Sequence, residues 1–359
     1  MFEFLNNWLA NGGFWVAIPL IIFGCAALIK GADFLVDGAS ALAKKYGVSD
    51  IVIGLTVVAF GTSMPEFVVN MVAVGQGSTE IAITNVLGSN IINIFVILGF
   101  TALIYPISSQ KSTRRFDIPF SLLAALLVLL FAVYNSPSWL QIEHIFNMNI
   151  ADPTLSDLGS IQMGQGNGGF ISGVGGSILL IFFLIFLWHN FKGIGSAPQT
   201  ESNEEYKPMS AKRALALIIG GLVGLVVGGE VIVKSATSIA QSLGVSDAII
   251  GLTVVALGTS LPELATSCMA AFKKNCDIAL GNVIGSNLFN IFFILGTSAC
   301  VKALPGYHGL EIDAMMAALG SVFVMLFVYL TKKHEIKRWH GAILLLTYAA
   351  YLAYRIITL

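Results

Sequence analysis

Apolar runs about as long as a bilayer is thick recur along the whole chain, separated by short polar and charged clusters. About 20 apolar residues are enough for a helix to span the hydrocarbon core of a membrane. The pattern predicts ten membrane-crossing helices, near residues 14–44, 49–75, 81–104, 117–134, 171–190, 213–242, 246–272, 278–301, 312–331 and 339–357. The first and sixth runs are longer than a perpendicular crossing needs, so we expect these helices to tilt.

The composition agrees with this pattern. The 359 residues are 56% hydrophobic and only 11% charged, with a mean hydropathy of +0.84. Soluble domains carry about 25% charged residues, so we expect an all-α multi-pass protein of the cell membrane. The net charge of -1 leaves no basic stripe for nucleic acid. We expect a monomer whose partner is the lipid bilayer, with no nucleic-acid partner and no cofactor.

Basic residues indicate the orientation of the helices. One set of alternating loops holds 15 of the 19 Lys and Arg residues: Lys44, Lys45, Lys111, Arg114, Arg115, Lys192, Lys207, Lys212, Arg213, Lys273, Lys274, Lys332, Lys333, Lys337 and Arg338. Because cytoplasmic loops are enriched in basic residues, this set predicts that both termini lie outside the cytoplasm. Within helices, Lys30 with Asp33 and Glu230 with Lys234 are spaced to pair, whereas Asp37 has no partner at such spacing.

The two halves of the chain repeat each other at a shift of 197 residues. Residues 47–66 match residues 244–263 at 16 of 20 positions, and residues 81–99 match residues 278–296 at 13 of 19. Five crossings separate equivalent points, so the repeats have opposite orientations. We therefore predict a first five-helix repeat (1–191, with a long outer loop at 135–170), a cytoplasmic linker (192–212) and a second, inverted repeat (213–359). Inverted repeats are typical of secondary transporters, which bind substrates where the repeats meet.

Each repeat carries a glutamate in the middle of an apolar crossing, Glu66 in the first and Glu263 in the second. A charge at this depth costs at least about 2.5–3.5 kcal/mol on insertion scales and therefore marks an ion pathway by default. A structural carboxylate, paired with a lysine or kept protonated, is the alternative. The same motif holds no Lys, Arg or His, and the glutamate occurs twice, so the ion pathway is favoured.

The residues before each glutamate add oxygen atoms. Thr62 and Ser63 precede Glu66 by four and three residues and so share its helical face, as Thr259 and Ser260 do with Glu263. Pro65 and Pro262 lack an N–H group, so the carbonyls of Gly61 and Gly258 lose their helical partners. We expect two broken helices that offer carbonyls, hydroxyls and a carboxylate. Such hard oxygen donors suit Ca²⁺ and Na⁺.

The following crossing in each repeat carries a polar stripe. The stripes are Asn85, Ser89 and Asn93 in the first repeat, and Asn282, Ser286 and Asn290 in the second. Spacing by four residues places each set on one helical face. For Asn85, Asn90, Asn282 and Asn287, bonding to a neighbouring helix is at least as good an interpretation as cation ligation. For Ser89, Asn93, Ser286 and Asn290, ligation is favoured.

At these residues the sequence resembles the sodium/calcium exchanger branch of the calcium/cation antiporter superfamily, over all ten predicted crossings. The duplicated GTSMPE/GTSLPE and GSNIIN/GSNLFN segments carry the resemblance. It implies a core of broken second, third, seventh and eighth helices, across which the first and sixth slide. The implied ligands are Glu66, Glu263 and the Thr62 and Thr259 carbonyls for Ca²⁺; the Ala59 carbonyl, Ser63 and Ser89, and the Ala256 carbonyl, Ser260 and Ser286, for flanking Na⁺; and Asn93 and Asn290 at the centre.

One position departs from part of this family. Some members, including K⁺-dependent exchangers, have Asp where this chain has Asn290, so we expect no K⁺ co-transport. The Gly-Asn-x-x-Glu motif of vacuolar-type H⁺/Ca²⁺ exchangers is absent at 61–66. The leading hypothesis is a Na⁺/Ca²⁺ antiporter that works by alternating access, and the alternative is an H⁺/Ca²⁺ antiporter. Rivals from other classes are a cation channel and, with least support, an intramembrane hydrolase using Ser63 or Ser260.

Overall fold

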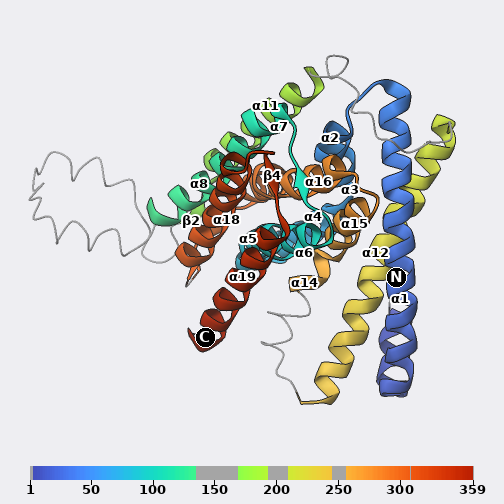
Figure 1. The fold of residues 1–359 in the computed structure, drawn as a ribbon. Coiled ribbons are helices and arrows are strands. Elements are labelled where there is room, and N and C mark those ends of the chain that lie inside the picture. The colour runs from blue at the N-terminus through green and yellow to red at the C-terminus, as the bar shows by residue number, and fades with distance from the viewer. Residues whose placement is uncertain (1–2, 135–168, 193–208, 245–255, 308, 359) are drawn as a thin grey trace, which may run out of the picture.

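Helices occupy all ten predicted runs (Figure 1). The computed structural model describes residues 3–134, 169–192, 209–244, 256–307 and 309–358, so the seventh run is seen only from Ala256. Most of the predicted outer loop at 135–170 and of the linker at 192–212 lies outside the described residues. The longer helices are α1 (Glu3–Tyr46), α4 (Met64–Gly75), α5 (Thr79–Ile92), α8 (Asp117–Tyr134), α11 (Gly173–Lys192), α12 (Ala211–Ser242), α15 (Leu261–Phe272), α16 (Cys276–Leu288), α18 (Leu310–Leu330) and α19 (Arg338–Thr358).

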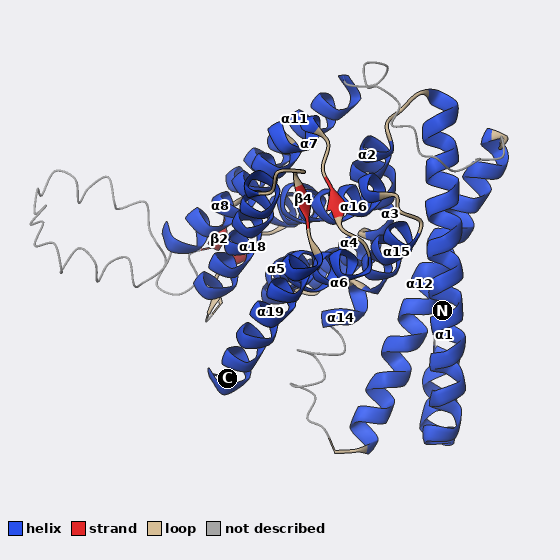
Figure 2. Ribbon diagram, viewed as in Figure 1, coloured by secondary structure: helices blue, strands red, loops and turns tan. Residues whose placement is uncertain are grey.

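Short helical segments complete or connect these helices. They are α2 (Asp50–Ile53), η1 (Gly54–Val58), α3 (Ala59–Thr62), η2 (Asn93–Leu98), α6 (Gly99–Ile104), α7 (Lys111–Arg115), α14 (Ala256–Thr259), η4 (Phe289–Leu295) and α17 (Gly296–Val301). Two pairs of very short antiparallel strands, β1 (Ile107–Ser108) with β4 (Glu335–Ile336) and β2 (Gly169–Ile171) with β3 (Leu304–Pro305), are the strands of the described residues (Figure 2). The predicted all-α membrane architecture is confirmed. Eight single helices of the described chain are long and apolar enough to cross a membrane, and one bent pair makes a ninth candidate.

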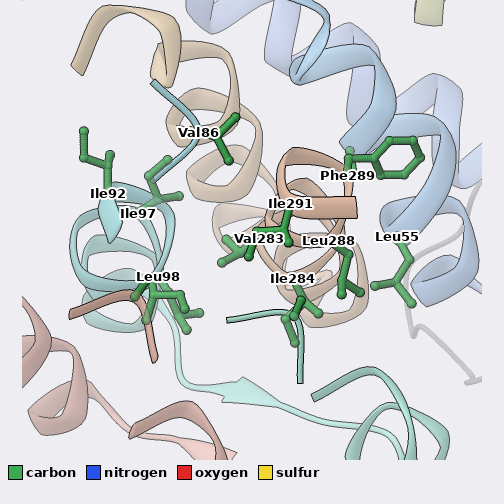
Figure 3. Packing of buried hydrophobic residues seen from close by; sticks show 14 of the residues in the cluster. Leu55, Val86, Ile92, Ile97, Leu98, Val283, Ile284, Leu288, Phe289 and Ile291 are labelled. Atoms are coloured by element: carbon green, nitrogen blue, oxygen red, sulfur yellow. The ribbon is translucent and has the colours of Figure 1, made fainter. Parts of the chain in front are cut away.

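The third and eighth spans, Thr79–Ile104 and Cys276–Val301, form the centre of the molecule. In their most apolar stretches 78% and 94% of the residues are buried, against 17% in α1. Side chains such as Val86, Val283 and Ile284 pack between these spans and their neighbours (Figure 3). Lipid tails are as apolar as these side chains, so close packing rather than escape from water holds the centre together.

The third and eighth helices are wound into π turns rather than broken. The resemblance implied breaks there, but each span is continuous and contains a π-helical segment, η2 or η4, at matching places in the two repeats. No proline interrupts either segment, so the backbone N–H groups remain available and the helix widens without a gap. π-Helical turns of this kind are frequent at functional sites.

The first and sixth helices, α1 and α12, lie side by side along one edge of the molecule (Figure 1). Glycines let their backbones touch: a Cβ atom added to Gly31 would lie 2.7 Å from the carbonyl oxygen of Gly221, and one added to Gly221 would lie 2.7 Å from that of Gly31. Large apolar side chains of the pair, among them Trp15 and Ile22, are exposed on the surface. These exposed side chains suit contact with lipid.

An ion-pair cluster ties α1 to the end of α15. The predicted pairs are present, with Lys30 3.6 Å from Asp33 and Glu230 3.4 Å from Lys234. Spacing along one helix could not predict the contacts of Lys273, which lies in another part of the chain. Its Nζ lies 2.6 Å from carboxylate oxygens of both Asp33 and Asp37. Burial by itself lowers the pKa of Lys273, but the two carboxylates outweigh burial and raise it. Lys273 is therefore a firm cationic bridge between the two elements.

Candidate cation site

The second and seventh predicted helices each turn sharply at a serine. Ser63 lies between α3 and α4 with φ −84° and ψ 4°, and the two parts of this span meet at 45°. Ser260 lies between α14 and α15 with φ −90° and ψ 4°. The proline two residues later has no N–H to continue the preceding helix and suits the first turn of the next one. The duplicated sequence thus produces the same turn in both repeats.

Glu66 and Glu263 lie in the first turns of the new helices, and both side chains are fully buried. The first turn of a helix favours negative charge because its N–H groups lack helical partners. Ser63 Oγ and Ser286 Oγ donate to Glu263 Oε1 at 2.9 and 3.4 Å. In the other repeat, Ser89 Oγ donates to Glu66 Oε1 at 3.4 Å. Since Ser63 and Glu263 belong to different repeats, the two helix turns meet.

A second contact across the repeats closes the arrangement. Ser260 Oγ donates to Ser89 Oγ at 3.4 Å, and Ser89 in turn reaches Glu66. The structure therefore brings together both glutamates and the four serines of the sequence prediction. Side chains almost 200 residues apart in the chain converge on one buried polar centre.

Several buried oxygen atoms of this centre have no hydrogen-bond partner among the described residues. They are Oε2 of Glu66 and of Glu263, Oδ1 of Asn93 and of Asn290, and Oγ1 of Thr259. Leaving a buried acceptor unpaired costs about 1–3 kcal/mol, and more for a charged group. A set of unpaired oxygens that includes two carboxylates is stabilised by a bound cation. The donor set suits hard cations, which prefer carboxylate, amide and hydroxyl oxygens.

No protein cation neutralises the two carboxylates within the described parts of the chain. The five ion pairs found there involve Asp33, Asp37, Glu230 and Asp313 and leave out both site glutamates. Pairing of Glu66 or Glu263 with lysine, one of the two structural alternatives that the sequence left open, is therefore not seen in these residues. The site retains a formal charge of −2 when both glutamates are ionised.

Thr62 and Ala59, which precede Glu66, make different hydrogen bonds. The single Thr62 hydroxyl proton has three acceptors within reach: Asn282 Oδ1 of the other repeat at 3.1 Å, and in its own helix the carbonyls of Val58 at 3.1 Å and Ala59 at 3.3 Å. Its hydroxyl thus joins helices, which leaves its carbonyl as the candidate ligand. The Ala59 carbonyl accepts the Ser63 N–H at 3.0 Å, and the Thr62 hydroxyl lies 3.3 Å from it. Because it already accepts a backbone N–H, the Ala59 carbonyl has less free acceptor capacity for a cation in this conformation.

The equivalent residues of the second repeat are seen less completely. Thr259 ends α14, and its buried hydroxyl belongs to the unpaired set. Ala256 begins α14 directly after residues 245–255, which lie outside the described chain.

Asn85 and Asn282 brace the helices behind the site. Asn85 Nδ2 donates to Asn70 Oδ1 at 2.7 Å, and Asn282 Nδ2 donates to Ser267 Oγ at 2.9 Å. Each also approaches the backbone carbonyl of the glutamate in its own repeat, at 3.4 and 3.3 Å. Of the two interpretations left open, helix-to-helix bonding is therefore the one seen. Asn70 and Ser267 were not predicted, although they are equivalent under the same 197-residue shift and lie four residues after the glutamates.

Comparison with known proteins settles the family. The model of the family described as sodium/calcium exchanger protein matches residues 16–192 and 213–357. The chain belongs to the sodium/calcium exchanger family.

Individual relatives agree with this membership. The chain is 33% identical over 351 residues to the sodium/calcium exchanger MaX1 of Methanosarcina acetivorans, covering 93% of this chain and 96% of the relative. It is 32% identical over 302 residues to the inner membrane protein YrbG of Escherichia coli, covering 84% and 82%. Its fold matches a solved structure of the sodium-calcium exchanger NCX_Mj with a TM-score of 0.74 and 31% identity, covering 94% of this chain and 98% of that one.

Family membership fixes the general activity. Like the other members, this exchanger-family protein is a multi-pass membrane transporter, a cation antiporter and not an enzyme. The predicted resemblance and the predicted fold class are both confirmed. The buried oxygen-lined centre lies where α4, α5, α15 and α16 meet, as expected for transporters built from inverted repeats.

Proposed function

We propose that this protein exchanges Na⁺ for Ca²⁺ across the membrane by alternating access. The observation that carries the proposal is the pair of fully buried glutamates, one from each repeat, each with an unpaired carboxylate oxygen and no basic partner among the described residues. One Ca²⁺ or two Na⁺ neutralise a charge of −2. The relatives named above as sodium/calcium exchangers support the same choice of ions.

The ligands proposed for each ion are those that the family resemblance implies, and the convergence of both glutamates and the four serines supports them. Ca²⁺ is held by Glu66 and Glu263 with the carbonyls of Thr62 and Thr259. One Na⁺ is held by Ser63 and Ser89 and another by Ser260 and Ser286, each beside a glutamate oxygen, while Asn93 and Asn290 line the centre between them. Ions that share ligands exclude one another, and this exclusion couples the flow of Na⁺ to that of Ca²⁺. If each cycle moves one net charge, the membrane potential contributes about 2.3 kcal/mol per 100 mV.

Ca²⁺ uptake into vesicles tests the proposal. The purified protein is reconstituted into liposomes, and Ca²⁺ uptake is followed after an outward Na⁺ gradient or a pH gradient is imposed alone; protein-free liposomes are the control. We expect the Na⁺ gradient to drive accumulation and the pH gradient to have no effect. Accumulation on the pH gradient without Na⁺ identifies an H⁺/Ca²⁺ antiporter instead. Passive entry without any counter-ion gradient identifies a channel.

Alternating access requires one part of the protein to move against another, and α1 with α12 is the part suited to move. The glycine contacts join these two helices backbone to backbone. The ion pairs of Lys273, at the end of α15, with Asp33 and Asp37 of α1 hold α1 to the core in the present conformation. The basic-residue pattern predicts that Lys273 lies on the cytoplasmic side and both termini outside. These ion pairs must break when α1 slides.

Lys273→Gln is therefore expected to shift the conformational equilibrium away from the present state. In the 197-residue repeat the counterpart of Lys273 is Gln76, so the variant gives both repeats the same uncharged residue. Partly exposed ion pairs are typically worth about 0.5 kcal/mol each, so loss of the two pairs is expected to shift the equilibrium by roughly five-fold. Distances between spin labels on α1 and α15 measure it. Lys274→Gln, at the neighbouring exposed lysine, is the control, and an unchanged distance distribution in Lys273→Gln contradicts the assignment.

A further inference from the structure

Two asparagines, Asn90 and Asn287, bond to each other's backbone where α5 crosses α16. Asn90 Nδ2 donates to the Asn287 carbonyl at 3.3 Å, and Asn287 Nδ2 donates to the Asn90 carbonyl at 3.4 Å. Both side chains are buried and are related by the 197-residue repeat. From the sequence, their roles stay open between cation ligation and bonding to a neighbouring helix.

These two hydrogen bonds fix the orientation of both side-chain amides, that is, which way the NH₂ group and the Oδ1 atom of each asparagine point. A backbone carbonyl only accepts hydrogen bonds, so each asparagine must turn its NH₂ group toward the opposite carbonyl. The Oδ1 atom of each then faces the other way, and a neighbouring amide uses it as an acceptor. Asn93 Nδ2 donates to Asn287 Oδ1 at 3.0 Å, and Asn290 Nδ2 donates to Asn90 Oδ1 at 3.0 Å.

The orientation of the two site asparagines follows by the same logic. With their NH₂ groups held by Asn287 and Asn90, Asn93 and Asn290 turn their Oδ1 atoms away from that contact. Both Oδ1 atoms are buried without a hydrogen-bond partner in the described chain. Asn93 and Asn290 lie one helical turn beyond Ser89 and Ser286, which contact the glutamates. The unpaired amide oxygens are therefore available to a cation.

We propose that Asn90 and Asn287 are positioning residues that orient the ligand amides of Asn93 and Asn290. Each acts on the opposite repeat: Asn287 orients Asn93, and Asn90 orients Asn290. An amide is nearly symmetric in shape but not in charge, so a rotation of 180° replaces the ligand oxygen by two N–H groups that repel a cation. The inference rests on the proposed function, because it assumes that Asn93 and Asn290 bind the transported cation.

A double-mutant cycle separates positioning from a purely structural role. Asn287→Ala removes the acceptor for Asn93 and frees its amide to rotate. Outer residues that orient metal ligands typically change metal affinity by 10–100-fold, so we expect Ca²⁺ binding about ten-fold weaker. In an Asn93→Asp background the same Asn287→Ala change is expected to cost no affinity, because both ends of a carboxylate are oxygen. Ca²⁺ and Na⁺ binding to purified protein is measured by isothermal titration calorimetry.

Thermal unfolding of the same variants supplies the structural readout. If Asn287 only bonds one helix to another, Asn287→Ala lowers the midpoint temperature in both backgrounds and leaves the dissociation constants for Ca²⁺ and Na⁺ unchanged. Asn190→Ala, at a buried asparagine that bonds the Phe186 carbonyl, is the control for loss of a buried amide. If Asn287→Ala does not fold, Asn90→Ala tests the same claim through Asn290.

The outcomes distinguish the inference from the proposed function. If the wild-type protein binds Ca²⁺ and the Asn287→Ala variant binds it with the same affinity, the positioning role is overturned and the proposed antiporter function stands. An equal loss of affinity in the wild-type and Asn93→Asp backgrounds overturns it as well. Wild-type protein that binds neither Ca²⁺ nor Na⁺ removes both the inference and the proposed function.

Discussion

Glu66→Gln and Glu263→Gln are each expected to reduce Na⁺-driven Ca²⁺ uptake by at least about 100-fold. Each substitution keeps the size of the side chain and removes one of the two negative charges of the site. Residues that only support metal ligands already account for 10–100-fold in affinity, so loss of a carboxylate ligand belongs at or beyond the upper end of that range. Folding should be preserved, since an amide is cheaper to bury than an unpaired carboxylate.

The matched control for these variants is Glu80→Gln. Glu80 lies in the first turn of α5, as Glu66 does in α4, but its side chain is exposed. We expect this variant to transport at the wild-type rate. Uptake in reconstituted vesicles and thermal unfolding in detergent are measured on all three variants. Near-normal uptake by both site variants would remove Glu66 and Glu263 from the transport site.

Gly221→Ala is expected to destabilise the protein by about 1–3 kcal/mol, the usual cost of inserting a methyl group into a tight contact. The added Cβ atom would lie 2.7 Å from both the Gly31 carbonyl oxygen and the Leu35 backbone nitrogen. Backbone atoms of a helix cannot move aside as a flexible side chain does. The only relief is to push α1 and α12 apart, which loosens the whole contact between them.

Gly220→Ala provides a control one residue away. Gly220 is exposed on α12, and no described atom lies within 4 Å of where its Cβ would be. Alanine favours a helix over glycine by up to about 1 kcal/mol, so this variant should be unchanged or slightly more stable. Thermal unfolding in detergent compares the two. Equal midpoint temperatures for Gly221→Ala and Gly220→Ala would show that the close approach of α1 and α12 is not needed for stability.

The parts of the site that lie in short, repeated motifs were predictable from the sequence. Glu66 and Glu263 stand out because charge is expensive inside a membrane, and Ser63 and Ser260 follow from their spacing to them. Pro65 and Pro262 predict the helix breaks because proline lacks the N–H that would bond the carbonyl four residues earlier in the chain. The π turns of the third and eighth helices carry no such local signal, and breaks were wrongly expected there.

Contacts between distant residues were not predictable in this way. Lys273 was assigned to a basic loop, yet it pairs with two aspartates of α1 more than 230 residues earlier in the chain. Asn85 and Asn282 were ambiguous, because the same amide can bind a cation or a helix, and only its neighbours decide. The roles inferred for Asn90 and Asn287 depend on an exchange of hydrogen bonds between the two repeats.

The sequence by itself determined the apolar helices, the duplicated architecture and the chemical character of the buried oxygens. Length, hydropathy and repetition along the chain express these properties directly. Only the tertiary structure decided which oxygen atoms of that set are already hydrogen-bonded and which are free to face a cation. The reason is physical: a hydrogen bond is set by distance and direction between atoms, and the chain brings its two halves together only when it folds.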